Sequence, residues 1–152
     1  MAKKLDYLNP GMSSQKEAEQ KINELVQQSK ILEAYMNDIL VKEATVTKLM
    51  GEAHLTSQAL QDLGSDSEYE SLIPLGIGVY AKARILPIND LYVNVGADVT
   101  LTKSRQDTIN FVESKIKEFE IAGRQLYSQK EQIASRMHGI QNEINGILQK
   151  SS

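Results

Sequence analysis

Apolar residues recur at alternating spacings of three and four positions in the first third of the chain. The run begins at Ile22 and ends at Leu60, and no proline interrupts it. Nine of its twelve positions are apolar, and the twelve are Ile22, Leu25, Ser29, Leu32, Met36, Ile39, Glu43, Val46, Met50, Ala53, Ser57 and Leu60. Such spacing places side chains on one narrow stripe of a helix, which is the seam of a coiled coil. The pattern predicts a long helix over about residues 14–63.

The last third of the chain repeats this pattern and predicts a second helix over about residues 104–149. Ser104 is the expected N-cap, and Asp107 is favourable in the first turn. Ten of the twelve stripe positions are apolar, and the twelve are Ile109, Val112, Ile116, Phe119, Gly123, Leu126, Lys130, Ile133, Met137, Ile140, Ile144 and Ile147. We expect the two helices to pair in an antiparallel coiled coil. The alternative, a helical bundle, would need wider apolar faces and more short turns.

The ends of the first helix carry local signals. Asn9-Pro10-Gly11 reads as a break, and Ser14 with Glu17 then forms a capping box, in which each side chain binds a free amide of the first turn. Gly64 occupies the position of a glycine that ends a helix. These signals place the first helix between Ser14 and Leu63.

The two stripes also predict how the helices align. If Leu60 lies opposite Val112, Glu43 lies near Lys130, and these are the only charged members of the two stripes. A polar pair at seam positions often fixes the register of a coiled coil. The alternative is two unrelated charges that each extend to solvent.

Between the stripes the periodicity changes to that of β-strands. The segments SLIPL, VYAKARI, LYVNV and DVTLT are short and rich in β-branched residues, and turn residues separate them. We predict four strands in two hairpins over about residues 71–103. The expected fold class is therefore α+β: one domain over residues 1–152, in which a long antiparallel two-helix coiled coil carries a central block of two β-hairpins.

The glycines of this block also fit a dinucleotide-binding motif. Gly76, Gly78 and Ala81 match G-x-G-x-x-A, and Asp98 follows at about the spacing of a ribose-binding acid. That motif must open a helix whose N-terminus faces the pyrophosphate. Here the alternating segment VYAKARI follows, which is typical of a strand. We therefore interpret the glycines as hairpin residues that supply positive φ or a bulge.

Composition narrows the functional classes. A net charge of −3 favours neither nucleic acid nor an anionic membrane as a partner, and the absence of Cys fits a reducing compartment such as the cytoplasm. The sequence shows no secretory signal and no run long enough to span a membrane. His54 and His138 lie outside the stripes and predict no metal site, and no catalytic motif is present. We expect neither catalysis nor a cofactor.

Four short strands are too few to bury their own apolar faces, and exposed strand edges pair with other chains. We therefore expect this block to carry oligomerisation rather than to form a self-contained sheet. The apolar residues expected at the subunit contacts are Leu72, Ile73, Leu75, Val79, Ala81, Ala83, Ile85, Val93, Val95, Val99 and Leu101.

The arrangement of helix, two hairpins and helix resembles the alpha class of prefoldin subunits, of the archaeal type. The specific segments are SLIPLGIGVYAKARI and LYVNVGADVTLTKSRQDTINFVESKI, and the resemblance covers nearly the whole chain. The beta class is similar but has a single hairpin, so the count of two hairpins supports the alpha class. One departure is Asp98-Val99-Thr100, where the family pattern has an aromatic or small apolar residue. This departure puts the strand pairing there in doubt but not the architecture.

The resemblance implies an ATP-independent holdase. Two alpha and four prefoldin beta subunits would join through their hairpins, and the tips of the coiled coils would hold unfolded polypeptides and pass them to a group II chaperonin. The alternative is a structural coiled-coil scaffold or filament subunit that binds no client.

Client contacts are expected at the helix ends far from the hairpins. The candidates are Ile22, Leu25, Val26, Ile140, Ile144, Ile147 and Leu148, with Tyr7, Leu8 and Met12 as a mobile addition. Apart from Val26 and Leu148, which lie beside the stripes, the helical candidates are stripe residues, so each of them is equally well explained as part of the seam.

Overall fold

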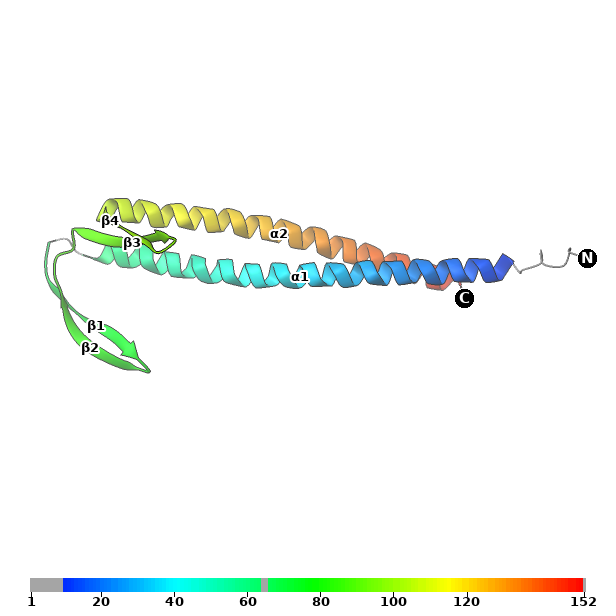
Figure 1. Cartoon of the computed structure of the whole chain (residues 1–152), viewed down its shortest axis with the longest axis horizontal. Coiled ribbons are helices and arrows are strands. Elements are labelled where there is room, and N and C mark those ends of the chain that lie inside the picture. The colour runs from blue at the N-terminus through cyan, green and yellow to red at the C-terminus, as the bar shows by residue number, and fades with distance from the viewer. Residues whose placement is uncertain (1–9, 64–65, 152) are drawn as a thin grey trace, which may run out of the picture. The chain divides into compact units, whose positions relative to one another are not determined.

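The computed structural model describes residues 10–63 and 66–151. Its elements are, in chain order, α1 (Pro10–Asp62), β1 (Tyr69–Gly76), β2 (Val79–Ile85), β3 (Asp90–Gly96), β4 (Val99–Ser104) and α2 (Arg105–Lys150), as Figure 1 shows. Two long helices therefore flank a central block of two antiparallel hairpins, β1–β2 and β3–β4, each of which is its own two-stranded sheet. The predicted α+β fold class is confirmed.

The predicted seam is confirmed on both helices. Every one of the twelve stripe positions on α1, and every one of the twelve on α2, is buried or half-buried. The neighbouring positions on α1 are exposed almost throughout. The three-four spacing thus identified the residues that each helix buries, because only a stripe of that spacing stays on one side of a supercoiled helix.

The prediction for the start of α1 was wrong. The helix begins at Pro10, so Asn9-Pro10-Gly11 is not a break, and Ser14 and Glu17 lie inside the helix instead of forming a capping box. Proline lacks an amide N–H and has a φ that suits a helix, so it is well tolerated in the first turn, where the amides have no helical partner. The predicted terminal glycine, Gly64, lies outside the described residues.

The start of α2 agrees with the prediction. The Ser104 hydroxyl accepts a hydrogen bond from the backbone N–H of Asp107 at 3.1 Å, which is the geometry of an N-cap. The buried Thr108 hydroxyl donates to the Ser104 carbonyl at 2.8 Å. These two bonds fix the point at which β4 becomes α2.

Both hairpins turn over two residues with positive φ, which is the geometry of a type I′ turn. In β1–β2 these residues are Ile77 and Gly78, and in β3–β4 they are Ala97 and Asp98. The register shifts just before each turn, at Gly76 and at Gly96, whose φ values are 123° and 111°. The interpretation of Gly76 and Gly78 as hairpin residues that supply positive φ or a bulge is confirmed, and Gly96 has a positive φ at the matching place of the other hairpin.

The strands are slightly longer than predicted. The first begins at Tyr69 and not at Ser71, because Tyr69 pairs with Ile85 and Glu70 pairs with Arg84. The carboxylate of Glu70 also lies 2.8 Å from the Lys82 ammonium. The hairpin therefore extends beyond the predicted segment by a pair that joins Tyr69 to Ile85 and by a pair of opposite charges, Glu70 and Arg84.

The chain forms two compact units, which we describe separately. The terminal unit comprises the residues up to Thr45 and from Gly123 onward, and the central unit runs from Val46 to Ala122. The core of the central unit is Leu60, Ile109 and Val112, with Leu91 of β3 among the residues packed against it. This contact confirms that Leu60 and Val112 meet, and it attaches β3 to the helices.

Candidate functional site

The predicted client residues lie in the terminal unit, near the start of α1 and the end of α2. Leu25 and Ile140 are each only 1% exposed, whereas Val26 is 36% and Leu148 is 52% exposed. The remaining three predicted residues, Ile22, Ile144 and Ile147, are half-buried. The structure therefore divides the predicted set into seam residues and two accessible neighbours.

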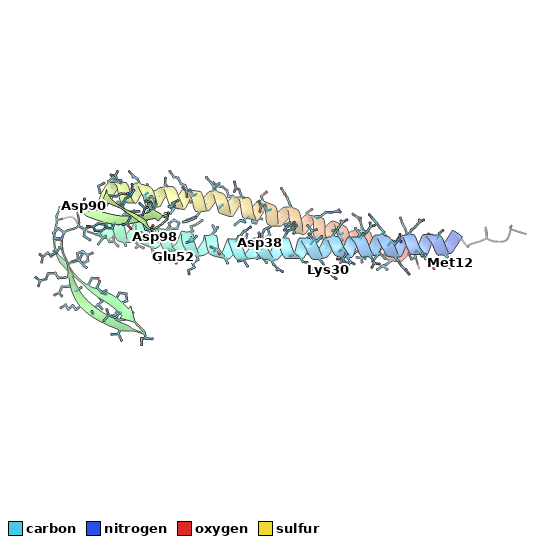
Figure 2. All side chains as sticks on the ribbon, in the orientation of Figure 1. Met12, Lys30, Asp38, Glu52, Asp90 and Asp98 are labelled. Carbon is cyan, nitrogen blue, oxygen red and sulfur yellow. The ribbon has the colours of Figure 1, made fainter. Side chains whose placement is uncertain are left out.

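Other residues near these helix ends add accessible apolar surface. Met12 lies on the first turns of α1 and is about half exposed, and it is labelled in Figure 2. Tyr7 and Leu8 lie outside the described residues. Val26, Leu148 and Met12 are thus the predicted client residues that an incoming chain can reach without separating the helices.

Farther along the terminal unit, the two charged stripe residues meet. The Lys130 ammonium lies 2.7 and 2.8 Å from the two carboxylate oxygens of Glu43, and both side chains are less than a third exposed. The ammonium also lies 5.5 Å from the centre of the Tyr127 ring. The predicted interhelical ion pair is confirmed, and it brings a charged group of each helix to a shared point in the seam.

The predicted assembly residues fall on two hairpins with different surroundings. On β1–β2, Ile73, Ala81, Ala83 and Ile85 alternate onto one face, on which Ile73 is exposed and the other three are half-buried. Leu72, Leu75 and Val79 are exposed. This hairpin therefore offers apolar side chains to solvent over most of its length.

On β3–β4 one face is partly covered. Val93 is only 8% exposed and Leu91 packs against the core, while Val95, Val99 and Leu101 remain exposed. The covered end lies next to the start of α2, and the exposed end lies next to the turn, where Figure 2 labels Asp98. Val93 is thus a core residue of this chain as well as a predicted assembly residue.

Sequence reasoning missed Arg105, the first residue of α2. Its Nε donates to the Leu60 carbonyl at 2.8 Å, and its terminal nitrogen donates to the Gln61 carbonyl at 2.9 Å. These carbonyls belong to the last turn of α1, which has no helical donors for them. The signal for this contact in the sequence was an arginine that directly follows the predicted N-cap, where the chain returns from the hairpins to the end of the first helix.

The described residues contain no cluster of three or more His, Asp or Glu side chains that would hold a metal ion. Over residues 10–63 and 66–151, no helix has a stretch that is both long and apolar enough to cross a lipid bilayer. The described residues expose apolar side chains near the helix ends and on the hairpins, as well as along the helices.

Comparisons with known proteins agree with this architecture. The family model described as "Prefoldin subunit" matches residues 18–150. The prefoldin subunit alpha of Nitrosopumilus maritimus is 32% identical over 136 residues, which cover 90% of this chain and 91% of the relative. That of Archaeoglobus fulgidus is 29% identical over 140 residues, with 91% and 99% covered.

A solved structure shares the fold. The cryo-EM structure of filamentous PFD from Methanocaldococcus jannaschii superposes with a TM-score of 0.63 and covers 80% of this chain and 98% of its own, at 14% sequence identity. Two paired helices, two hairpins and these matches lead to one assignment. The chain belongs to the prefoldin family and is a relative of its archaeal alpha subunits.

Proposed function

We propose that this chain is a holdase subunit that binds non-native polypeptides, without ATP, at the ends of α1 and α2 nearest the chain termini. Prefoldins are chaperones, and in the family alpha subunits assemble with beta subunits. The observation that carries the proposal is the exposure of Val26 and Leu148 near the buried seam residues Leu25 and Ile140. A non-native polypeptide exposes apolar side chains, and these residues offer it apolar surface in return.

The seam residues at the same ends have a different role in this proposal. Leu25 and Ile140 hold the helices together, so Val26, Leu148 and Met12 make the first contacts with a client. Each contact is weak, because an aliphatic side chain contributes only about 1–3 kcal/mol to the binding free energy when a client covers it completely. Several subunits that present such ends to one client would add their contacts through multivalency.

The hairpin block supplies the assembly in this proposal. Its exposed apolar residues and unpaired strand edges would join two copies of this chain to four beta subunits. Such a hexamer would present several helix ends to one client. It would act in the cytoplasm and deliver the client to a group II chaperonin. Weak and separate contacts favour this delivery, because they can be released one at a time.

The client site is tested with a triple variant, Met12→Ser, Val26→Ser and Leu148→Ser, assembled with the beta subunit of the same organism. The readout is aggregation of chemically unfolded citrate synthase on dilution. We expect the complex to form normally and to lose most of its protection. The matched control is Val41→Ser, Leu55→Ser and Ile121→Ser, three residues that are likewise exposed on the helices. If the first variant protects as well as the intact chain does, the helix ends are not the client site.

The alternative function, a scaffold or filament subunit without clients, predicts a different result. The intact complex would then fail to protect citrate synthase, and electron microscopy would show extended filaments. The filamentous structure of the M. jannaschii protein supports only the shared fold at 14% identity, so it does not favour this alternative.

A further inference from the structure

The turn of the β1–β2 hairpin contains an unfavourable residue choice. Ile77 has a φ of 41°, a left-handed conformation that is rare for β-branched residues because Cβ crowds the backbone. A two-residue turn of this type normally takes Asn or Asp before Gly. Ile77 is also fully exposed, so no contact within the described chain compensates for this conformation.

The other hairpin shows that the fold does not require such a residue. At the matching turn position, Ala97 has a φ of 49°, and the next residue, Asp98, has a φ of 59°. Alanine is small, and aspartate is one of the residues that tolerate this region. The Asn94 side chain also accepts a hydrogen bond from the N–H of Gly96 at 2.9 Å, which supports that turn locally. The same turn geometry is thus reached without a large apolar side chain.

The surroundings of Ile77 indicate what would contact it. Leu75, Val79 and Tyr80 are all more than half exposed at the same end of the hairpin. No charged residue occurs from Leu75 to Ala81. The charges of this hairpin lie nearer its base, where Glu70 pairs with Lys82 and Glu68 lies 3.7 Å from Arg84. The turn end is uncharged and apolar, so its complement is an apolar surface.

We propose that Ile77 is an anchor residue that inserts into an apolar recess on the neighbouring beta-class subunit of the assembled complex. This inference rests on the proposed assembly through the hairpins and adds a specific contact to it. In this proposal the bound state buries the side chain that is strained and fully exposed in the unassembled chain. Burial of an isoleucine in a recess is enough to make it a strong contributor to subunit affinity.

The test compares variants of the full-length chain in their affinity for the beta subunit of the same organism, measured by sedimentation velocity and native mass spectrometry. Ile77→Asn keeps the turn and removes the apolar side chain. We expect it to weaken assembly about tenfold or more, as loss of a buried aliphatic anchor does. Ile77→Leu retains the apolar group and should assemble within about threefold of the intact chain. Ala97→Asn, at the matching turn of β3–β4, should assemble normally.

Each outcome decides the question. Normal assembly of Ile77→Asn overturns the inference, and so does equal weakening by Ala97→Asn, which would show a general sensitivity of the turns. Thermal unfolding of the unassembled chain should be unchanged or higher for Ile77→Asn, since asparagine tolerates positive φ. A lower unfolding temperature would contradict the strain on which the inference depends.

A second comparison separates this inference from the proposed assembly itself. Val79→Lys places a charge among the exposed apolar residues of the hairpin. If Val79→Lys abolishes assembly while Ile77→Asn does not weaken it, only the anchor role fails. If Val79→Lys assembles normally, the proposed assembly surface on this hairpin fails as well.

Discussion

The two hairpins of the central unit share a turn design but differ in what covers their apolar faces. In β3–β4, Val93 is buried and Leu91 packs against the helix core, whereas in β1–β2 the apolar residues Leu72, Leu75 and Val79 are exposed. The sequence pattern of the two hairpins is alike. One hairpin thus packs against the helices of its own chain, and the other leaves several of its apolar side chains accessible.

The largest effect is expected from placing a charge on each hairpin in turn. Val93→Lys buries an unpaired ammonium beside the core and should lower the free energy of unfolding of the isolated chain by about 3 kcal/mol. Val79→Lys adds the same charge at an exposed position and should change it by less than about 0.5 kcal/mol. Urea unfolding followed by circular dichroism measures both. Equal losses would show that the two hairpins are covered to the same extent.

The next effect concerns the arginines that lie at the base of each hairpin. Arg105 donates to two carbonyls at the end of α1, so Arg105→Ala should lower the free energy of unfolding by about 2 kcal/mol, the usual value for charged hydrogen bonds. Arg84 of β2 makes an exposed ion pair at 3.7 Å, and Arg84→Ala should cost at most about 0.5 kcal/mol. Arg105→Lys, which cannot reach both carbonyls in the same planar geometry, should fall between these values. An Arg105→Ala protein as stable as the intact chain would show that the cap contributes nothing.

The same contrast between covered and exposed surfaces applies to ion pairs in the terminal unit. The Glu43–Lys130 pair is less than a third exposed, so Glu43→Gln should lower the free energy of unfolding by about 1 kcal/mol. The Asp38–Lys42 pair on α1 is also 2.7 Å long but more than half exposed, and Asp38→Asn should cost only about 0.3 kcal/mol. Thermal unfolding at low and high salt measures the difference. A greater loss for Asp38→Asn would contradict the role of the seam pair.

The smallest effect compares a helix glycine with a turn glycine. A Cβ added to Gly139 or Gly146 of α2 would meet nothing within 4 Å, so Gly139→Ala should raise the free energy of unfolding by about 0.5–1 kcal/mol. Gly78 has a φ of 76° in the turn of β1–β2, and Gly78→Ala should lower it by about 1 kcal/mol, because alanine is strained there. Differential scanning calorimetry of the two variants should give shifts of opposite sign. Shifts of the same sign would exclude this conformational explanation.

The sequence alone predicted the type and order of the elements and the seam, and it offered one register, which the structure confirms. Spacing of three and four residues identifies which side chains a supercoiled helix buries, because that geometry depends on the helix itself and on few distant contacts. The Glu43–Lys130 pair was one of two alternatives that this periodicity allowed, and the structure decided for the pair because the register aligns the two positions. The four strands followed from alternation, and the two turns from their glycines.

Local signals failed at the start of α1, where Pro10 opens the helix and does not interrupt it. Proline is compatible with a break and with a first helical turn, so the local residues do not distinguish the two. At the start of α2 the predicted N-cap was correct, and the Ser104 hydroxyl accepts a hydrogen bond from the N–H of Asp107.

The tertiary structure decided which residues of each predicted set are accessible. Leu25 and Val26 are adjacent in the sequence and both apolar, yet Leu25 is buried and Val26 is more than a third exposed. The capping of α1 by Arg105, the burial of Val93 and the full exposure of Ile77 likewise depend on which segments meet in space. Periodicity fixes the face that a helix or strand turns inward, but burial also depends on the distance and size of the neighbouring element, and this is set only when the chain has folded.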